Sequence, residues 1–395
     1  MNSAHSPRIA VAGGGVGGLA CARGLQLHGL SVTVFERETS STARWQGGML
    51  DLHAPTGQAA MRAAGLFDKF RALARPEAQE LRALDPITAK LLHHEGPVDG
   101  DGFAPEIDRG QLRGLLLGAL EPGTVHWGQS IESATALDSG AARLRFGDGT
   151  TEDFDLVVGA DGAWSRVRPA LSGATPAHLG TTMVETWLDD IDTSHPALAR
   201  LTGDGTLVAK VGSKMLSAQR NSGGHLRVYA ALDVPPDWHV AAGVDLADAA
   251  AVRAYLLAQF DGWHNSLLDL LRHDGDFVNR PLYVLPVGHR WDHVPGITLV
   301  GDAAHLMPPF GVGANLALVD GTDLATAVAT HPNLDEAVRA YEGVMLPRGA
   351  AAAQACAELA EVMTAEPVLD VDAARQQLND RLLSPERTVR TAPAE

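Results

Sequence analysis

The chain has 395 residues, of which 45% are apolar and 20% are charged, so it can bury a sizeable core and does not have the composition of a disordered protein. Its formal net charge of −17 argues against general binding to nucleic acid or to an anionic membrane, because both need a positive protein surface. The two cysteines, Cys21 and Cys356, exclude a disulfide framework and a CxxC metal or redox pair. The longest uncharged apolar stretch, residues 9–22, is too short to span a bilayer. We therefore expect a cytoplasmic enzyme with more than one domain.

The first 36 residues predict a β-α-β unit, with strands at 8–12 and 31–36 and a helix at 17–28. Between the first strand and the helix, Gly13, Gly15 and Gly18 form the pattern GxGxxG. The first glycine permits a tight turn, the second lets a pyrophosphate approach the backbone, and the third lets the helix pack closely on the sheet.

Glu36 ends the second strand, about 20 residues after the glycines, where a carboxylate can bind a ribose hydroxyl. A glycine-rich turn without a ligand is the alternative, and the complete β-α-β context argues against it. The helix N-terminus adds oriented N–H groups and a partial positive charge for phosphates. The sequence therefore predicts a dinucleotide site.

Two later strand ends carry acidic motifs. The segment DGAWSRVR begins at Asp161, directly after the buried run 156–159, and GDAAH begins at Gly301, after the run 297–300. Ligands of open α/β sheets bind beyond the carboxyl ends of the strands. Asp161 and Asp302 can therefore contact a cofactor, or each can cap a helix instead.

The rest of the chain changes in character along its length. Short helices are predicted at 58–64 and 112–120, and residues 181–283 alternate as antiparallel strands do, most clearly at 226–232, with a helical insert at 249–260. Two longer helices are predicted at 314–330 and 334–363. The fold class is therefore α/β, a Rossmann-like domain interrupted by a β-sheet domain, with a C-terminal helical segment.

Together, the GxGxxG, DG and GD motifs resemble those of the FAD-dependent aromatic hydroxylases, the single-component flavoprotein monooxygenases similar to p-hydroxybenzoate hydroxylase. The resemblance covers nearly the whole chain. It implies bound FAD, a visiting NAD(P)H, expected to be NADPH, and a flavin C4a-hydroperoxide that gives one oxygen atom of O2 to an aromatic or polycyclic substrate. Within this family, residues 47–53, 58–61 and 301–310 are most similar to the tetracycline-inactivating monooxygenases, so a tetracycline is one candidate substrate.

The resemblance also implies a domain division and a set of cofactor contacts. We expect an FAD-binding domain at 1–75, 103–178 and 281–333, a substrate-binding sheet domain at 76–102 and 179–280, a helical segment at 334–383 and a frayed tail at 384–395. The expected cofactor contacts are Gly13, Gly15, Gly18, Glu36, Arg37, Arg44, Asp51, Arg109, Asp161, Asp302, Pro309, Gly313 and Asn315, with Arg44 matching the arginine that contacts the nicotinamide. For Arg109, a solvated charge at a helix end is the alternative.

Substrate contacts are expected on the inserted sheet and the flavin loop, at Glu185, Met215, Gln219, Arg227 and Phe310. Outward-facing strand residues and ordinary core residues would give the same pattern. The family's substrate-binding glutamine falls on Glu185, its arginine near Thr206 and a histidine near Arg227, so none of the three keeps its chemistry. The loop at 308–315 is also one residue shorter than the family's and lacks its glutamine.

No side chain is expected to perform the chemical step, because the flavin carries it. No metal site is expected, since HExxH is absent from the sequence, and Ser165 lacks the GxSxG context of a hydrolase. The other expected partners are a small molecule and O2, and the chain is expected to be a monomer or a weak dimer. Two alternatives stay open: a flavin-dependent reductase of the same fold, and a non-catalytic protein that binds flavin or drugs.

Overall fold

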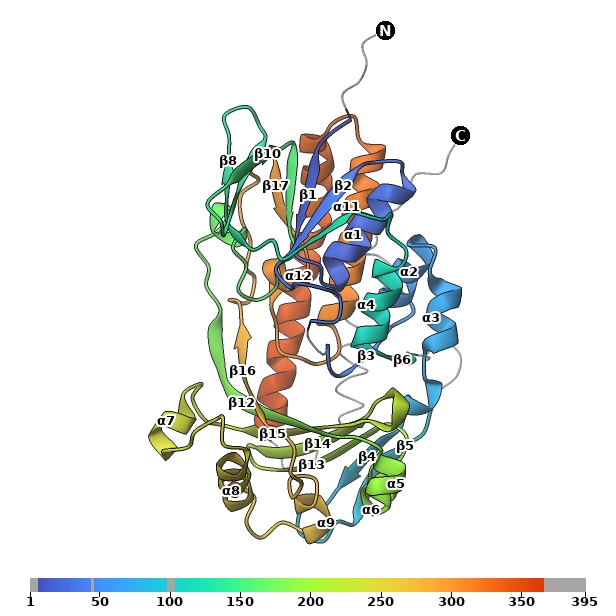
Figure 1. The fold of residues 1–395 in the computed structure, drawn as a ribbon, viewed down its shortest axis with the longest axis vertical. Coiled ribbons are helices and arrows are strands. Elements are labelled where there is room, and N and C mark those ends of the chain that lie inside the picture. The colour runs from blue at the N-terminus through green and yellow to red at the C-terminus, as the bar shows by residue number, and fades with distance from the viewer. Residues whose placement is uncertain (1–5, 44–45, 98–103, 366–395) are drawn as a thin grey trace.

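The computed structural model of the chain describes residues 6–43, 46–97 and 104–365 (Figure 1). The expected tail at 384–395 and Arg44 lie outside the described residues. The glycine-rich segment follows the first strand of a five-stranded parallel sheet, whose strands lie in the order β17 (Ile297–Leu299), β11 (Leu156–Gly159), β1 (Ile9–Ala12), β2 (Val32–Glu36) and β7 (Val125–Trp127). All four pairings are parallel, so the strands end at one common edge.

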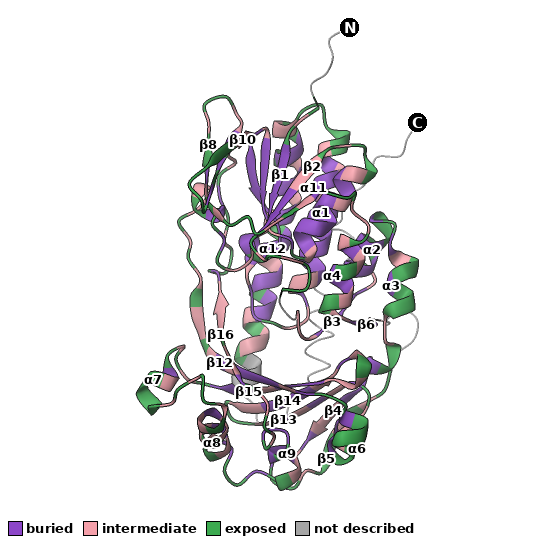
Figure 2. Ribbon diagram, in the orientation of Figure 1, coloured by how far each residue is buried: buried purple, intermediate pink, exposed green. Residues whose placement is uncertain are grey.

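Helices and a second sheet cover this parallel sheet. Its strands are therefore buried, as Figure 2 shows for β1. Its apolar residues form one core with those of α1 (Val16–Leu27), α11 (Gly313–Thr330) and the start of α12 (Leu334–Ala365). The same core includes residues of a three-stranded antiparallel sheet, in the order β10 (Thr151–Phe154), β9 (Ala142–Phe146) and β8 (Ile131–Ala136). Cys21 packs in this core with no exposed surface, as expected for a small apolar residue.

A seven-stranded sheet forms the other large part of the molecule (Figure 1). Its strands lie in the order β16 (Val278–Val284), β12 (Ala177–Leu188), β15 (Leu226–Leu232), β14 (Lys214–Arg220), β13 (Thr206–Val211), β4 (Leu81–Leu84) and β5 (Leu91–Glu95). Only β13 and β4 pair in parallel among these described strands. The strands β12 and β16 cross the positions 178/179 and 280/281, where the sequence places domain boundaries; the division itself stays a prediction.

Successive residues of these strands face opposite sides, as β geometry requires. Leu207, Leu216 and Val228 are fully buried and pack with Val252 and Phe260, on the side covered by the helices of the insert. Those helices are α5 (Ile191–Ser194), α6 (Pro196–Thr202), α7 (Trp238–Ala242), α8 (Ala249–Gln259) and α9 (Asn265–Leu268). The alternate residues are therefore left for the opposite side of the sheet.

The remaining named helices and strands are short and belong to neither large sheet. They are the paired strands β3 (Met49–Asp51) and β6 (Glu106–Asp108), the helices α2 (Gly57–Ala63), α3 (Phe67–Leu73) and α4 (Arg109–Leu117), and the single turn α10 (Asp302–His305). The predicted α/β class, with its parallel sheet and C-terminal helix, is confirmed. Helix α12 runs from the parallel sheet toward β15 (Figure 1).

Candidate functional site: a cavity at the strand ends

One cavity of about 1420 Å³ is lined by the ends of the parallel strands and by the open side of the seven-stranded sheet. Single small-molecule sites have volumes of roughly 300–1,000 Å³. The cavity therefore has space for a large cofactor and a second small molecule together. Four strand ends reach it, at Gly13, Glu36, Asp161 and Gly301.

The glycine-rich turn has the geometry that a phosphate site needs. Gly13 has a φ of +113°, and a Cβ there would lie 2.4 Å from the carbonyl oxygen of Ala160, so no other residue fits. A Cβ at Gly18 would lie 2.2 Å from the Gly13 oxygen, which lets α1 pack directly on the turn. A Cβ at Gly15 would meet no protein atom within 4 Å. The first N–H groups of α1 also have no side-chain cap, so they are open to a phosphate.

Glu36 joins the end of β2 to this turn. Its Oε2 accepts a hydrogen bond from the Gly14 nitrogen at 2.8 Å, and its Oε1 accepts one from the Glu38 nitrogen at 2.9 Å. A carboxylate has about four acceptor positions. Glu36 lines the cavity and therefore keeps capacity for ribose hydroxyls, while the exposed Arg37 beside it supplies a positive charge.

Arg113 is a site residue that the sequence reasoning missed. It is buried, and its Nε donates to the Gly14 carbonyl oxygen at 2.9 Å. Its Nη2 lies 3.1 Å from Glu38 Oε2 and 3.7 Å from Glu36 Oε2. This guanidinium offsets the negative charge of two carboxylates, which would otherwise repel an anionic cofactor at this site. A usable signal was present, since Arg113 interrupts an apolar helical face four residues after Arg109.

The DG motif organises its own loop and also reaches the cavity. Asp161 Oδ2 accepts hydrogen bonds from the Arg166 nitrogen at 2.6 Å and the Val167 nitrogen at 3.3 Å, whereas Oδ1 is buried and has no protein partner. Burial raises the pKa of Asp161. One oxygen of Asp161 therefore holds the loop, and the other has no protein partner, so a contact with the cofactor stays a prediction.

Arg168, from the same motif, ties this loop to the GD segment. Its side chain donates to the carbonyl oxygens of Ala163 at 2.7 Å, Ala303 at 3.1 Å and Ala174 at 3.2 Å. Burial lowers the pKa of the Arg168 guanidinium. The two acidic motifs are thus held together by a buried side chain.

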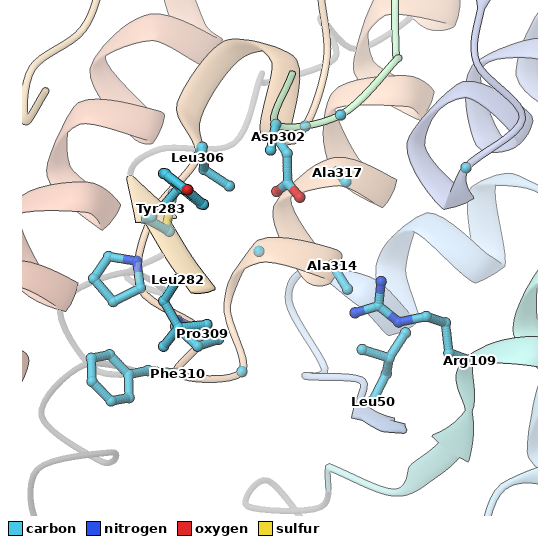
Figure 3. Close-up of a pocket in the computed structure, with 18 of the residues that line it drawn as sticks. Leu50, Arg109, Leu282, Tyr283, Asp302, Leu306, Pro309, Phe310, Ala314 and Ala317 are labelled. Carbon is cyan, nitrogen blue, oxygen red and sulfur yellow. The ribbon is translucent and has the colours of Figure 1, made fainter. Parts of the chain in front are cut away.

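The GD motif and Arg109 face each other across the cavity. Figure 3 shows the Asp302 carboxylate and the Arg109 guanidinium projecting from opposite sides toward the start of α11 at Ala314. Both side chains are exposed, and neither makes a hydrogen bond or ion pair within the described chain. Pro309, Phe310 and Gly313 line the same region. An acceptor and a cation are therefore presented together at a helix N-terminus.

The side chain of Asn315 holds the loop at 308–315 in place through hydrogen bonds. Its Oδ1 accepts hydrogen bonds from His53 N, Thr56 Oγ1 and Gly57 N, and its Nδ2 donates to the carbonyl oxygens of Asp51 and Gly311. The side chain is buried, and Asn315 is not among the residues that line the cavity, so its expected cofactor contact stays a prediction. Asp51 does line it, directly beside Gly311.

On the opposite wall, alternate residues of the seven-stranded sheet face the cavity, including Met183, Val208, Met215, Ser217, Gln219 and Tyr229. Burial, followed by the nearby Glu185 carboxylate, raises the pKa of Tyr229 to about 12, so its hydroxyl stays protonated. The structure thus brings three of the expected substrate residues, Met215, Gln219 and Phe310, to the cavity wall.

Glu185 and Arg227, the other two expected substrate residues, are engaged elsewhere. They form a buried ion pair with each other, and Glu185 Oε2 also accepts from Arg280 Nε at 2.9 Å. A Cβ at Gly47 would lie 3.0 Å from Arg227 Nη2, so the Gly47 backbone covers the pair. Neither side chain lines the cavity. Their contact with a substrate therefore stays a prediction: strand alternation places both residues on the cavity side of the sheet, but the covering loop was not visible in the sequence.

The described residues were also compared with the requirements of a metal site and of a membrane-spanning helix. Within them, no three His, Cys, Asp or Glu side chains are grouped so as to hold a metal ion. No helix in the described part of the chain has the length and apolar character needed to cross a membrane.

A glycine-rich turn, a ribose-type carboxylate and two acidic motifs on one cavity define a dinucleotide-binding flavoprotein site. The chain belongs to the FAD binding domain family, whose model matches residues 7–223 and 290–355. It is 31% identical over 400 residues to monooxygenase penA of Penicillium thymicola, which covers 86% of this chain and 91% of that protein. It is 29% identical to 3-amino-4-hydroxybenzoate 2-monooxygenase of Streptomyces cremeus, covering 90% and 87%. The protein is an FAD-dependent monooxygenase of the aromatic hydroxylase type.

Solved structures agree with this fold. The Klebsiella pneumoniae HpxO complex with FAD and uric acid superposes with a TM-score of 0.78 at 20% identity, covering 97% of each chain. The tetracycline destructase Tet(55) superposes with a TM-score of 0.72 at 23% identity, covering 96% of each chain. At this level of identity the likeness concerns the fold.

Proposed function

We propose that the protein uses NAD(P)H, with NADPH as the expected donor, and O2 to insert one oxygen atom into an aromatic or fused-ring, polyketide-like small molecule. The observation that carries the proposal is the single cavity shared by the dinucleotide motifs and the seven-stranded sheet. A cofactor held at the motifs and a substrate held on the sheet would meet in one space. A tetracycline is one member of the proposed substrate class.

The residues present fit FAD. The open Gly15 face and the uncapped N-terminus of α1 suit its pyrophosphate, and Glu36 suits a ribose. Asp302 and Arg109 would hold its flavin half through a hydroxyl and an anionic or carbonyl oxygen. When bound, FAD supplies the redox chemistry, accepting electrons from the nicotinamide and activating O2.

The chain itself would do three things. The N–H groups at the start of α11 would favour a negative charge that develops on a cofactor bound beside them. Met215, Phe310 and Pro309 supply apolar surface that keeps water from the reacting atoms. Gln219 and the protonated Tyr229 offer hydrogen bonds that orient a ring carrying polar groups.

Purified protein reconstituted with FAD tests the proposal. NADPH oxidation is measured with and without 3-amino-4-hydroxybenzoate, salicylate, uric acid and a tetracycline, followed by the product masses. Substrate-stimulated oxidation with a gain of one oxygen supports the proposal. A gain of two hydrogens would indicate a reductase instead, and tight ligand binding without stimulation would indicate a non-catalytic binding protein.

A further inference from the structure

A buried ionic cluster lies behind the GD motif and takes no part in the site described above. Its centre is Asp320 of α11, which has no exposed surface. Asp320 Oδ2 accepts a hydrogen bond from the Gly301 nitrogen at 2.9 Å and pairs with His305 Nε2 at 2.5 Å. Asp320 Oδ1 accepts from Arg348 Nη2 at 2.9 Å. Residues from the loop after β17 and from α10, α11 and α12 therefore meet at one carboxylate.

The cluster fastens α10 at both of its ends. Gly301 is the N-cap of this four-residue helix and His305 is its last residue, and both bond to the same oxygen of Asp320. Gly301 has a φ of +62°, a conformation that favours glycine, and a Cβ there would lie 2.9 Å from Ala317 Cβ. The turn has no room to shift toward α11. Asp302, the first residue of α10, is thereby held in one place.

Arg348 sets the charge balance of the cluster. Its Nη1 pairs with Asp323 at 2.7 Å while its Nη2 pairs with Asp320, and Asp320 and His305 are almost fully buried. Burial raises the pKa of Asp320, but His305 and Arg348 lower it by more, so Asp320 stays ionised. Removing the guanidinium would leave a buried carboxylate short of a partner, which is costly.

We propose that Asp320 and Arg348 are positioning residues for the Asp302 carboxylate, and that α12 is thereby part of the FAD site although only its far end lines the cavity. Arg348 fixes Asp320, Asp320 fixes both ends of α10, and α10 presents Asp302 to the cofactor. The inference depends on the proposed contact between Asp302 and FAD. An ion cluster that only stabilises the fold would change FAD affinity independently of Asp302.

A double-mutant cycle on FAD affinity separates these roles. The dissociation constant of FAD is titrated with apoprotein of the wild type, Asp302→Ala, Arg348→Met and the double variant. Arg348→Met is expected to weaken FAD binding roughly tenfold in the wild-type background and less than about twofold in the Asp302→Ala background. Full additivity would overturn the inference. If Asp302→Ala alone leaves the dissociation constant unchanged, the proposed Asp302 contact fails, and the inference falls with it.

Glu342 offers a matched control on the same helix. It is also buried, and it bonds to Trp291 Nε1 at 3.0 Å, Thr298 Oγ1 at 2.9 Å and His293 Nδ1 at 2.9 Å, so none of these hydrogen bonds reaches α10. Glu342→Gln is expected to lower thermal stability with less than about a twofold change in FAD affinity. Should Arg348→Met not fold, Arg348→Gln and Arg348→Lys replace it in the cycle, with the lysine, which keeps the positive charge, expected to retain part of the affinity that the glutamine loses. Equal FAD affinity in both replacements would contradict the proposal.

Discussion

The carboxylate of Glu36 lies 2.8 Å from the backbone nitrogen of Gly14, so one hydrogen bond joins the end of the second strand to the glycine-rich turn. Glu36→Gln keeps the shape but removes the charge and one acceptor. FAD binding is expected to weaken by roughly ten- to hundredfold, since a hydrogen bond to a charged group contributes about 1.5–3 kcal/mol. The measurement is the FAD dissociation constant. Glu132→Gln, at an exposed pair with Arg145, is the control and is expected to leave it unchanged.

The glycines of the turn separate folding from cofactor binding. Gly15→Ala adds a methyl group that meets no protein atom, so the apoprotein is expected to lose at most about 1 kcal/mol, the cost of a poorer N-cap. FAD affinity is expected to fall clearly, because the methyl enters the open face. Gly13→Ala, at a φ of +113° and with its Cβ 2.4 Å from a carbonyl oxygen, should instead destabilise the apoprotein by several kcal/mol. Apoprotein melting and FAD titration check both, and equal melting losses would contradict the assignment.

Asn315 is expected to be essential for stability through its side chain. Asn315→Ala breaks five hydrogen bonds and strands the Gly57 and His53 N–H groups, so we expect a loss of about 2–4 kcal/mol in the free energy of unfolding. Asn265→Ala, at an exposed helix start, is the control and should cost less than about 1 kcal/mol. Denaturant titration measures both. A loss below 1 kcal/mol for Asn315→Ala would show that the loop does not depend on this side chain.

Neighbouring residues of β14 should respond in opposite ways because they face opposite sides of the sheet. Met215→Ala enlarges the cavity and is expected to raise the KM for the aromatic substrate several-fold with little change in stability. Leu216→Ala empties the core beneath α8 and is expected to cost about 2–5 kcal/mol with the KM retained. Steady-state kinetics and melting of both variants test the register. A Leu216→Ala variant that keeps its stability but has a raised KM would show that Leu216, and not Met215, faces the cavity.

The His305 imidazole predicts a pH dependence. Burial lowers the pKa of His305, and the charge of Arg348 lowers it further. The charge of Asp320, the hydrogen bond to Asp320 and the charge of Asp302 raise this pKa by more, so in the folded protein it lies above the ordinary value of 6.5. The protonated form therefore adds stability that is fully present below pH 6.5 and is lost as the pH rises through the folded pKa. Apoprotein melting temperature is expected to fall more steeply above pH 6.5 in the wild type than in His305→Gln. Identical slopes would contradict a raised pKa.

Much of the cofactor side was predictable because its signals are local. The GxGxxG segment, Asp161 and Asp302 come just after buried strands and Glu36 ends one, and parallel strands end at one edge, so the four are expected to converge. Strands 156–159 and 226–232 were predicted with the bounds that the structure has. Asp302 and Asp161 line the cavity at the expected strand ends, although Asp161 also holds its own loop.

The rest depends on contacts between distant segments. That Gly47 would cover Glu185 and Arg227 cannot be read from strand alternation, which places both on the same side as Met215. Arg113 binds the Gly14 carbonyl from 99 positions away, and the His305–Asp320–Arg348 cluster joins segments separated by up to 43 positions in the chain. Such pairings are set by tertiary packing, and the sequence marks them only as charges inside apolar faces.

In the proposed reaction, one oxygen atom of O2 reaches an aromatic or fused-ring substrate in the shared cavity, with NAD(P)H as reductant. The direct measurement is turnover of the FAD-loaded protein with NADPH under ¹⁸O2, followed by the mass of the product from the substrate that stimulates NADPH oxidation. We expect a product heavier by one oxygen atom that carries the ¹⁸O label. A product that gains two hydrogens, or an added oxygen that carries no label, would contradict it.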